Sequence, residues 1–138
     1  MSSNNKLGRQ GIIELCNELG FDKQSYRLSY GSALVMHGVR QFAHDIDMDV
    51  SGDLFEELSH KYALKYKKDG ERYICIDDIV DVFATDSLAE DTVFIDGIPV
   101  AGLEHVREAK RRLGRDKDIE DIKLIEEFMA ARSKNNRS

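Results

Sequence analysis

Several features that would narrow the class of this protein are scarce in its sequence. Only two cysteines, Cys16 and Cys75, occur in 138 residues, and each lies among apolar neighbours. Disulfide-rich scaffolds contain many more cysteines, and a zinc site needs Cys/His pairs at a short spacing that is missing here. We therefore expect two reduced core thiols in a cytoplasmic protein.

Long apolar runs and a strong positive charge are also lacking. No window approaches the roughly 18 consecutive apolar residues of a membrane-spanning helix, so no membrane partner is expected. The polar start, Met1–Lys6, does not resemble a signal peptide. The formal net charge is −6, and residues 40–100 hold 15 acidic but only six basic side chains. This charge balance is not that of a protein that binds nucleic acid through a broad basic face, although a local site could still bind the end of a nucleic acid.

The remaining composition is that of an ordinary globular domain. Hydrophobic residues make up 41% and charged residues 33% of the chain, and we find neither an internal repeat nor a linker. We expect one domain over residues 1–132 and a polar, disordered tail over residues 133–138.

Hydrophobic periodicity predicts a mixed order of helices and strands. The expected helices are Asn5–Leu19, Ser32–His37, Asp53–Tyr62, Leu103–Leu113 and Lys117–Ala131. The expected strands are Tyr26–Tyr30, Asp45–Val50, Tyr62–Lys67, Glu71–Ile76, Ile79–Phe83, Thr92–Ile95 and Ile98–Val100. The fold class is therefore α+β, with a small mixed sheet, flanking helices and two helices at the C-terminal end.

The stretch from Tyr30 to Asp49 carries the most chemical information. It begins with a small-residue turn, Gly31-Ser32, after a predicted strand. Glycine allows close approach of the backbone, serine is a favoured helix cap, and free N–H groups at a helix start bind phosphate. An ordinary helix cap without a ligand would have the same geometry.

An alternation of acidic and apolar residues, Asp45-Ile46-Asp47-Met48-Asp49, follows this turn. In a strand, the three aspartates share one face, and adjacent carboxylates repel each other unless a cation such as Mg²⁺ lies between them. A solvated strand face and a calcium loop are the alternatives. A calcium loop needs glycine at its sixth position, where this sequence has Val50. We interpret Asp49 as a structural acid.

These motifs resemble the polymerase-β-like nucleotidyltransferase superfamily. Its signature is a Gly-Ser or Gly-Gly pair about a dozen residues before an Asp-x-Asp pair, as in Gly31-Ser32 and Asp45-Ile46-Asp47. The region around Arg40 is similar to small bacterial enzymes of the lincosamide nucleotidyltransferase type and to toxin-like relatives. The segments 98–105 and 110–121 resemble the second half of the same group.

The resemblance implies roles for particular residues. Asp45 and Asp47 would bind two Mg²⁺ ions, and a third carboxylate is expected on the neighbouring strand. Asp81 lies in an otherwise apolar strand, where an acid is costly without a partner or metal, so we choose it over Asp77 and Asp78.

Further residues are candidates for binding the triphosphate. Gly31 and Ser32 would cradle the phosphates, and Lys110 would reach the β- or γ-phosphate, although a solvated helix face is the alternative. Arg40 would contact the triphosphate or pair with Asp45. We interpret Asp118 and Asp121 as ion-pair partners that hold Lys110 and Arg115. A packing role and a catalytic role both stay open for His37 and His105, with packing favoured for His37.

The implied activity is Mg²⁺-dependent transfer of a nucleoside monophosphate from an NTP, such as ATP, to a hydroxyl or phosphate acceptor. The alternatives are a non-catalytic module that binds nucleotide, RNA or a partner protein, and a toxin-like enzyme acting on tRNA ends. The short chain leaves little room for an acceptor domain, so a second copy, in a homodimer, or a partner chain is a candidate source of part of the cleft.

Overall fold

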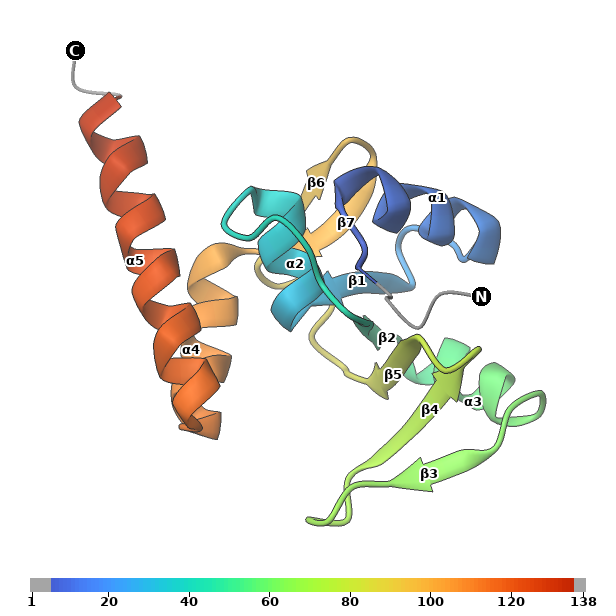
Figure 1. The fold of residues 1–138 in the computed structure, drawn as a ribbon. Helices are drawn as coiled ribbons and strands as arrows, with labels where there is room; N and C mark the ends of the chain where they lie inside the picture. Colours follow the sequence, from blue (N-terminus) through green and yellow to red (C-terminus); the bar gives the residue numbers. More distant parts are fainter. Residues whose placement is uncertain (1–5, 136–138) are drawn as a thin grey trace.

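The protein is built around one seven-stranded mixed sheet, which a computed structural model describes for residues 6–135 (Figure 1). The strands are β1 (Tyr26–Ser29), β2 (Ile46–Val50), β3 (Leu64–Tyr66), β4 (Arg72–Ile76), β5 (Val80–Ala84), β6 (Thr92–Ile95) and β7 (Ile98–Ala101). The helices are α1 (Arg9–Leu19), α2 (Tyr30–His37), α3 (Gly52–Ser59), α4 (Leu103–Leu113) and α5 (Asp116–Asn135). The predicted fold class is confirmed.

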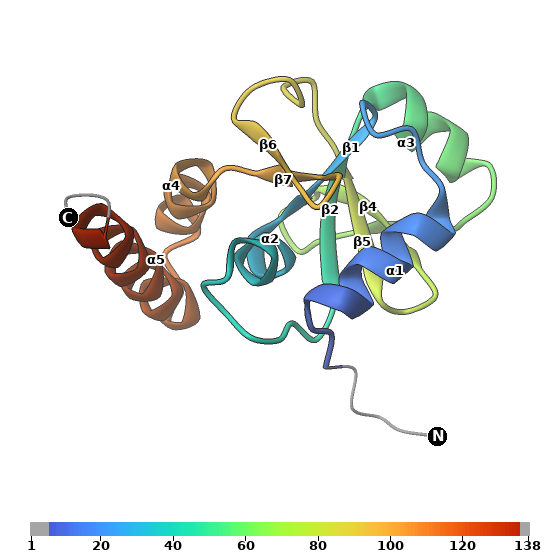
Figure 2. The same ribbon diagram turned by 90° about the horizontal axis from the view of Figure 1, so that it is seen from above.

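The sheet has the strand order β3-β4-β5-β2-β1-β7-β6. Strand β2 pairs antiparallel with β1 and parallel with β5, so these three strands form the centre of the sheet. The β3–β4 hairpin adds to one end and the β6–β7 hairpin to the other. Helices α4 and α5 stand beyond the side of the sheet opposite the β3–β4 hairpin (Figures 1 and 2).

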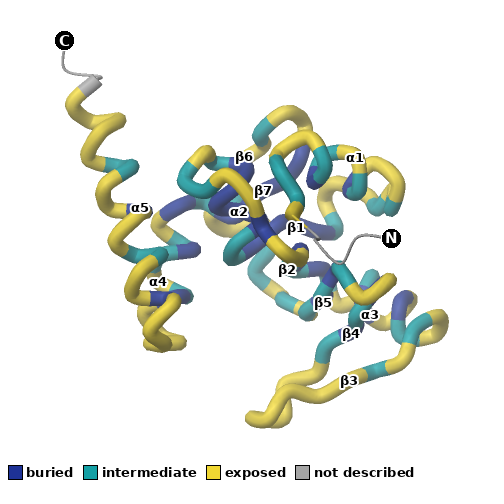
Figure 3. The backbone as a smooth tube through the Cα atoms, viewed as in Figure 1, coloured by how far each residue is buried: buried dark blue, intermediate teal, exposed yellow. Residues whose placement is uncertain are grey.

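One face of the sheet is apolar and forms the core. Alternate residues such as Leu28, Met48 and Val82 are fully buried there, as the period of two requires. Helices α1 and α3 pack against this face, since the thiol of Cys16 lies close to Tyr26 and the side chain of Arg72 lies over the ring of Phe55. Burial is therefore concentrated in the central strands and α2, whereas α5 and the β3–β4 hairpin are mostly exposed (Figure 3).

Several element boundaries differ from the predictions. Helix α2 begins at Tyr30 rather than Ser32, because Tyr30 itself makes the strand-to-helix turn with a φ of 48°. Helix α5 continues to Asn135, so residues 133–135 are helical and the prediction of a disordered tail is wrong there. The rest of that tail, 136–138, and residues 1–5 lie outside the described residues. Within residues 6–135, no helix is long and apolar enough to cross a membrane.

Candidate active site

The face of the sheet opposite the core carries a row of polar side chains across its central strands. Asp47 of β2 lies in register with Asp81 of the parallel strand β5 and with Ser29 of the antiparallel strand β1. Strand β4 continues the row with Cys75, which pairs with Asp81. The tertiary structure therefore brings two of the three predicted carboxylates together on neighbouring strands.

Three further acids considered for this site, Asp45, Asp77 and Asp78, lie outside the strands. Asp45 is exposed in the bend before β2, and its charge raises the pKa of Asp47. Asp77 and Asp78 occupy the turn before β5, where both have a positive φ and are exposed. The choice of Asp81 as the acid beside the Asp45–Asp47 segment therefore agrees with the strand register.

Asp47 is in an environment that disfavours its negative charge. Burial is the main cause, and the neighbouring carboxylates of Asp45 and Asp81 add to it, so that the pKa of Asp47 is raised to about 7. The ammonium groups of Lys67 and Lys110 act in the opposite direction. Within residues 6–135, Asp45, Asp47 and Asp81 form no ion pair, so the like charges are not neutralised by a salt bridge.

The donor set fits a hard divalent cation. Three carboxylates supply oxygen ligands, which Mg²⁺ prefers, and a cation would relieve the repulsion that raises the pKa of Asp47. In the part of the chain that the structure describes, no three His, Cys, Asp or Glu side chains already converge as ligands of one ion. Asp45 in its exposed bend is the acid with the most freedom to turn toward an ion.

The start of α2 provides polar groups beside this row. Ser29 occupies the N-cap position of α2, but its side chain makes no cap bond. Its Oγ is buried without a hydrogen-bond partner in the structure, which is costly for a hydroxyl group. The free N–H groups of the first turn and this hydroxyl together favour an anion at the helix start. Sequence reasoning missed Ser29. The available signal was its position two residues after Arg27 in the predicted strand, which places both side chains on one face.

The two residues predicted to cradle phosphate lie inside the first turn of α2. Ser32 is fully buried, and its Oγ lies 2.9 Å from the carbonyl oxygen of Ser29 and 3.1 Å from that of Asp47. The prediction that Ser32 caps the helix is therefore wrong, and its hydroxyl instead ties α2 to β2. A Cβ at Gly31 would lie 3.5 Å from Arg40 Nη1, an ordinary contact, so Arg40 alone does not require glycine there.

Lys110 is a buried member of an ion-pair cluster. Its Nζ lies 2.8 Å from Asp121 Oδ2 and 3.4 Å from Asp118 Oδ1. Asp118 also accepts hydrogen bonds from the backbone and side chain of Arg115, and these bonds with the two cations lower its pKa despite its burial. The interpretation of Asp118 and Asp121 as partners of Lys110 and Arg115 is confirmed.

Arg40 also belongs to this cluster. Its Nη1 lies 3.9 Å from Asp121 Oδ2, so of the two roles left open for Arg40 the pairing with Asp45 does not occur, and a contact with the triphosphate stays a prediction. The reason is the position of Asp121 on α5, which lies nearer to Arg40 than the bend that contains Asp45. Lys110 also lies over the ring of Tyr30, with 5.7 Å between Nζ and the ring centroid. The cluster therefore places positive charge near the start of α2.

A second buried cluster, which sequence reasoning missed, surrounds Arg27. Its Nε donates to Asp49 Oδ2 at 3.0 Å, and its Nη1 donates to the carbonyl oxygen of Glu90 at 2.6 Å. Its Nη2 donates to Nε2 of His105, 3.2 Å away, so that nitrogen is an acceptor. Asp49 is therefore structural, as expected, and the bond of His105 to Arg27 supports a packing role for that histidine. An arginine opposite an aspartate in two neighbouring strands was the signal for this pair.

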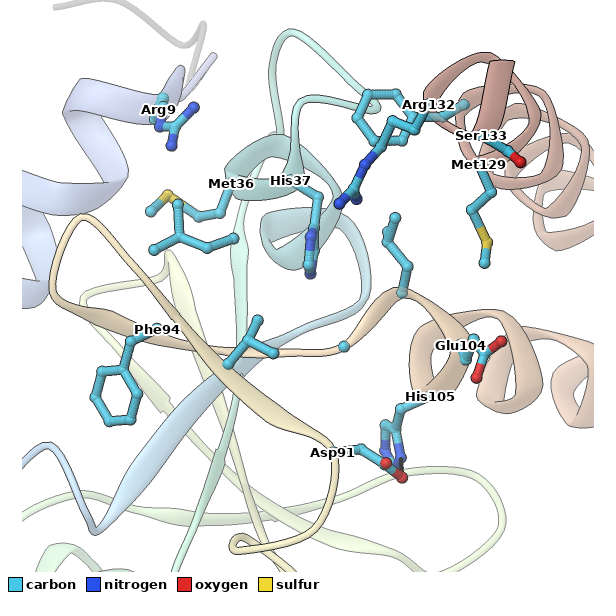
Figure 4. Close-up of a pocket in the computed structure, with 15 residues that line it drawn as sticks. Arg9, Met36, His37, Asp91, Phe94, Glu104, His105, Met129, Arg132 and Ser133 are labelled. Atoms are coloured by element: carbon cyan, nitrogen blue, oxygen red, sulfur yellow. Dashed lines mark ion pairs between the residues drawn. The ribbon is translucent and has the colours of Figure 1, made fainter. Parts of the chain in front are cut away.

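A hollow of about 990 Å³ lies between α2, α4, α5 and the β6–β7 hairpin (Figure 4). His37, Met129 and Arg132 line it, whereas Asp45, Asp47 and Asp81 do not. His37 is half-buried, and its Nε2 bonds to the carbonyl oxygen of Ala101 at 2.8 Å, which supports a packing role. Cys75 corrects another prediction: it is a half-exposed thiol beside Asp81 rather than a core residue, because its strand position faces the acidic row.

Comparisons with known proteins identify the fold. No family model matches the sequence, and no curated protein matches it. A crystal structure of a candidate nucleotidyltransferase from Thermotoga maritima aligns with 99% of this chain and 100% of its own, at a TM-score of 0.61 and 17% sequence identity. At this identity the likeness concerns the fold, and the chain therefore has a nucleotidyltransferase-like fold.

Proposed function

We propose that the protein is a Mg²⁺-dependent nucleotidyltransferase, which transfers a nucleoside monophosphate from an NTP to a hydroxyl or phosphate acceptor and releases pyrophosphate. The observation that carries this proposal is the pair Asp47 and Asp81, in register on neighbouring strands and without a salt-bridge partner in the described chain. The fold likeness supports the same class of activity.

The metal ligands in this proposal are the carboxylates of Asp45, Asp47 and Asp81. Asp45 and Asp47 would hold two Mg²⁺ ions, and Asp81 would complete the coordination on the acceptor side. When bound, the ions would neutralise charge on the α-, β- and γ-phosphates and acidify the acceptor hydroxyl. This role explains why the fold keeps a carboxylate with a raised pKa, Asp47, in the centre of the sheet.

The transfer step uses Asp81 as a proton acceptor. The acceptor hydroxyl loses its proton to Asp81, and its oxygen attacks the α-phosphorus of the NTP. A new oxygen–phosphorus bond forms while the bond from the α-phosphorus to the bridging oxygen of the β-phosphate breaks. The electron pair of that bond leaves with pyrophosphate. Most of the rate enhancement comes from positioning and charge neutralisation.

The triphosphate would lie on the α2 side of the acidic row. The backbone N–H groups at Gly31 and Ser32 and the unpartnered hydroxyl of Ser29 are the donors there. Lys110 and Arg40 would act mainly as fixed positive charges, because Asp121 holds both side chains in place. Binding of a phosphate at Lys110 would require it to exchange one of its carboxylate partners.

We further propose that the protein works in the cytoplasm. Both cysteines are free thiols. Burial raises the pKa of Cys16 to about 11, so this thiol stays protonated and unreactive at neutral pH. Free thiols agree with a reducing compartment.

The test combines binding and turnover. The protein is incubated with each labelled NTP and Mg²⁺, with and without total RNA, and every labelled product is identified by mass spectrometry. We expect Asp81→Asn to lower turnover by a factor on the order of 10² or more, as for the loss of a general base or metal ligand. NTP binding by this variant should stay within about tenfold of the wild type.

Asp78→Asn is the matched control, because Asp78 is an exposed acid in the turn before the same strand. It should leave turnover unchanged. Equal NTP affinity in Mg²⁺ and in EDTA would contradict the metal site. Mg²⁺-dependent NTP binding without any labelled product would instead indicate a non-catalytic binding module.

A further inference from the structure

The acidic face carries an aromatic pair beside Asp81. Phe83 lies two residues after Asp81 on β5, and alternation places both side chains on the same face. Phe83 stacks on Tyr73 of β4, with ring centroids 5.8 Å apart and an interplanar angle of 23°. Both residues are only half-buried, so part of their surface is open to solvent on the side of the sheet that lacks the core.

A lysine lies over these two rings. Lys67, at the end of the β3–β4 hairpin, places its Nζ 4.7 Å from the ring centroid of Tyr73 and 5.5 Å from that of Phe83. It is exposed and forms no ion pair within residues 6–135. Tyr73, Phe83 and Lys67 therefore form an aromatic shelf with one exposed cation.

The two sides of the acidic row differ in chemistry. On the side of β1 and α2 lie the helix start, the hydroxyl of Ser29 and the positive cluster around Lys110, all of which suit phosphates. On the side of β5 and β4 lies the aromatic shelf. The β3–β4 hairpin and α4 stand on opposite sides of the central strands (Figure 1). A transferase needs two substrates on opposite sides of its reacting centre, and the two sides match two different ligands.

We propose that the aromatic shelf binds the acceptor, and that the acceptor is a nucleotide, either free or at the end of an RNA. Because Lys67 covers the two rings, its ammonium group would have to move aside to let the base stack on Tyr73 and Phe83, and it would then pair with the phosphate of the acceptor. The ribose hydroxyl would face Asp81. Two strand residues span roughly 7 Å, which matches the reach from a base to its ribose hydroxyl. Stacking on aromatic side chains tolerates any base, so the shelf selects a planar ring rather than a sequence.

This inference rests on the proposed function, since the hydroxyl held at Asp81 is the group that attacks the α-phosphorus. The oxygen–phosphorus bond forms there, the proton passes to Asp81, and pyrophosphate leaves on the α2 side. A purely structural role for the aromatic pair would be to cover the sheet beneath the hairpin. That role requires neither the half-exposure of the rings nor an unpaired lysine above them.

The experiment separates the two substrate sites. The wild-type protein is first saturated with a non-hydrolysable ATP analogue and Mg²⁺. AMP, GMP, CMP, UMP and a short RNA are then titrated separately, while NMR follows the ring signals of Tyr73 and Phe83. We expect the ring signals to shift, and Phe83→Leu and Lys67→Gln each to weaken the second binding event by about tenfold. Binding of the ATP analogue should be unchanged in both variants.

Tyr66→Leu is the matched control. Tyr66 is a tyrosine of the same hairpin, 63% exposed, and its register with Arg72 places it on the opposite face from Tyr73. It should leave both binding events unchanged. Lys67 is exposed, so Lys67→Gln should fold even if Phe83→Leu does not.

The outcomes separate the inference from the proposed function. If the ATP analogue binds but no nucleotide or RNA shifts the ring signals, the acceptor assignment is overturned and the proposed function stands. If the analogue does not bind in Mg²⁺, the proposed function fails and the acceptor assignment fails with it. A response to RNA alone would assign an RNA end, and a response to the free nucleotides would assign a small acceptor.

Discussion

Asp47 and Asp49 lie two residues apart on β2 and face the same side of the sheet, yet their surroundings differ sharply. Asp49 bonds to Arg27 at 3.0 Å, and the side chain of Arg27 is 2% exposed. Asp47 has Asp81 and Asp45 as charged neighbours and forms no salt bridge in the described chain. The fold therefore supplies a buried counter-charge to one aspartate and none to the other.

This difference distinguishes a structural acid from a candidate metal ligand. Burial also raises the pKa of Asp49, but its hydrogen bond and ion pair with Arg27 oppose that rise. For Asp47, nearby carboxylates act in the same direction as burial. A buried charge without a counter-charge destabilises the folded protein, and such an arrangement is expected where a bound ligand supplies the missing counter-charge. Asp47 meets that description and Asp49 does not.

The largest expected effect on the free energy of unfolding comes from removing Arg27, the buried partner of Asp49. Arg27→Met should lower the free energy of unfolding by about 3–5 kcal/mol, because it leaves a buried carboxylate without its counter-charge. Urea denaturation measures this change. Arg9→Met is the control, since the Arg9–Asp96 pair is exposed and should contribute less than about 1 kcal/mol. An equal decrease in the free energy of unfolding for the two variants would contradict the structural role of Arg27.

A smaller effect of opposite sign is expected at Asp47. In EDTA at pH 8, Asp47→Asn should raise the free energy of unfolding by on the order of 1 kcal/mol, because it removes charge repulsion beside Asp81. Asp49→Asn should lower it, since Arg27 loses its charged partner. Thermal denaturation with and without Mg²⁺ measures both, and only the wild type and Asp49→Asn should gain stability from the metal.

The effect at Asp47 should depend on pH in a defined direction. The pKa of Asp47 is raised in the folded state to about 7 from its ordinary value of 3.8, so between these values the folded protein binds more protons than the unfolded chain. Stability of the metal-free wild type therefore falls as the pH rises through this window. The advantage of Asp47→Asn should be largest above pH 7 and should disappear near pH 4. A constant difference across this range would contradict the repulsion.

The smallest expected effect lies outside both aspartates, at His37. Its pKa is lowered, first by burial and then by the charges of Arg132 and Arg9, against a hydrogen bond to Ala101 that acts the other way. The unfolded chain therefore binds more protons below about pH 6.5, and folding stability falls as the pH drops. His37→Gln should reduce the loss of melting temperature between pH 7 and pH 5. An identical loss in wild type and variant would show that His37 does not contribute to it.

The sequence predicted most of the elements and the central acids. Local patterns were sufficient for α4, whose bounds match the prediction, and for the strand that contains Asp47 and Asp49. Asp45, predicted as the first residue of that strand, lies in the bend before it. The partners of charged residues were harder to predict, because a pair such as Lys110 and Asp121 depends on how two helices pack. Ser32 was assigned to the wrong position in α2, because Tyr30 adopts a positive φ that nothing in the sequence requires.

By itself, the sequence determined that Asp45, Asp47 and Asp49 alternate with buried residues, because the period of a strand is a local property. It also determined that Asp81 lies in an apolar strand that must satisfy or tolerate an acid. Only the tertiary structure decided which strand lies beside which. The register that joins Asp47 to Asp81, and Asp49 to Arg27, arises from pairing between segments distant in the chain. Those pairings depend on the packing of the whole sheet, which no local pattern specifies. They give Asp49 a counter-charge and Asp47 a second carboxylate, and this difference distinguishes the structural acid from the candidate ligand.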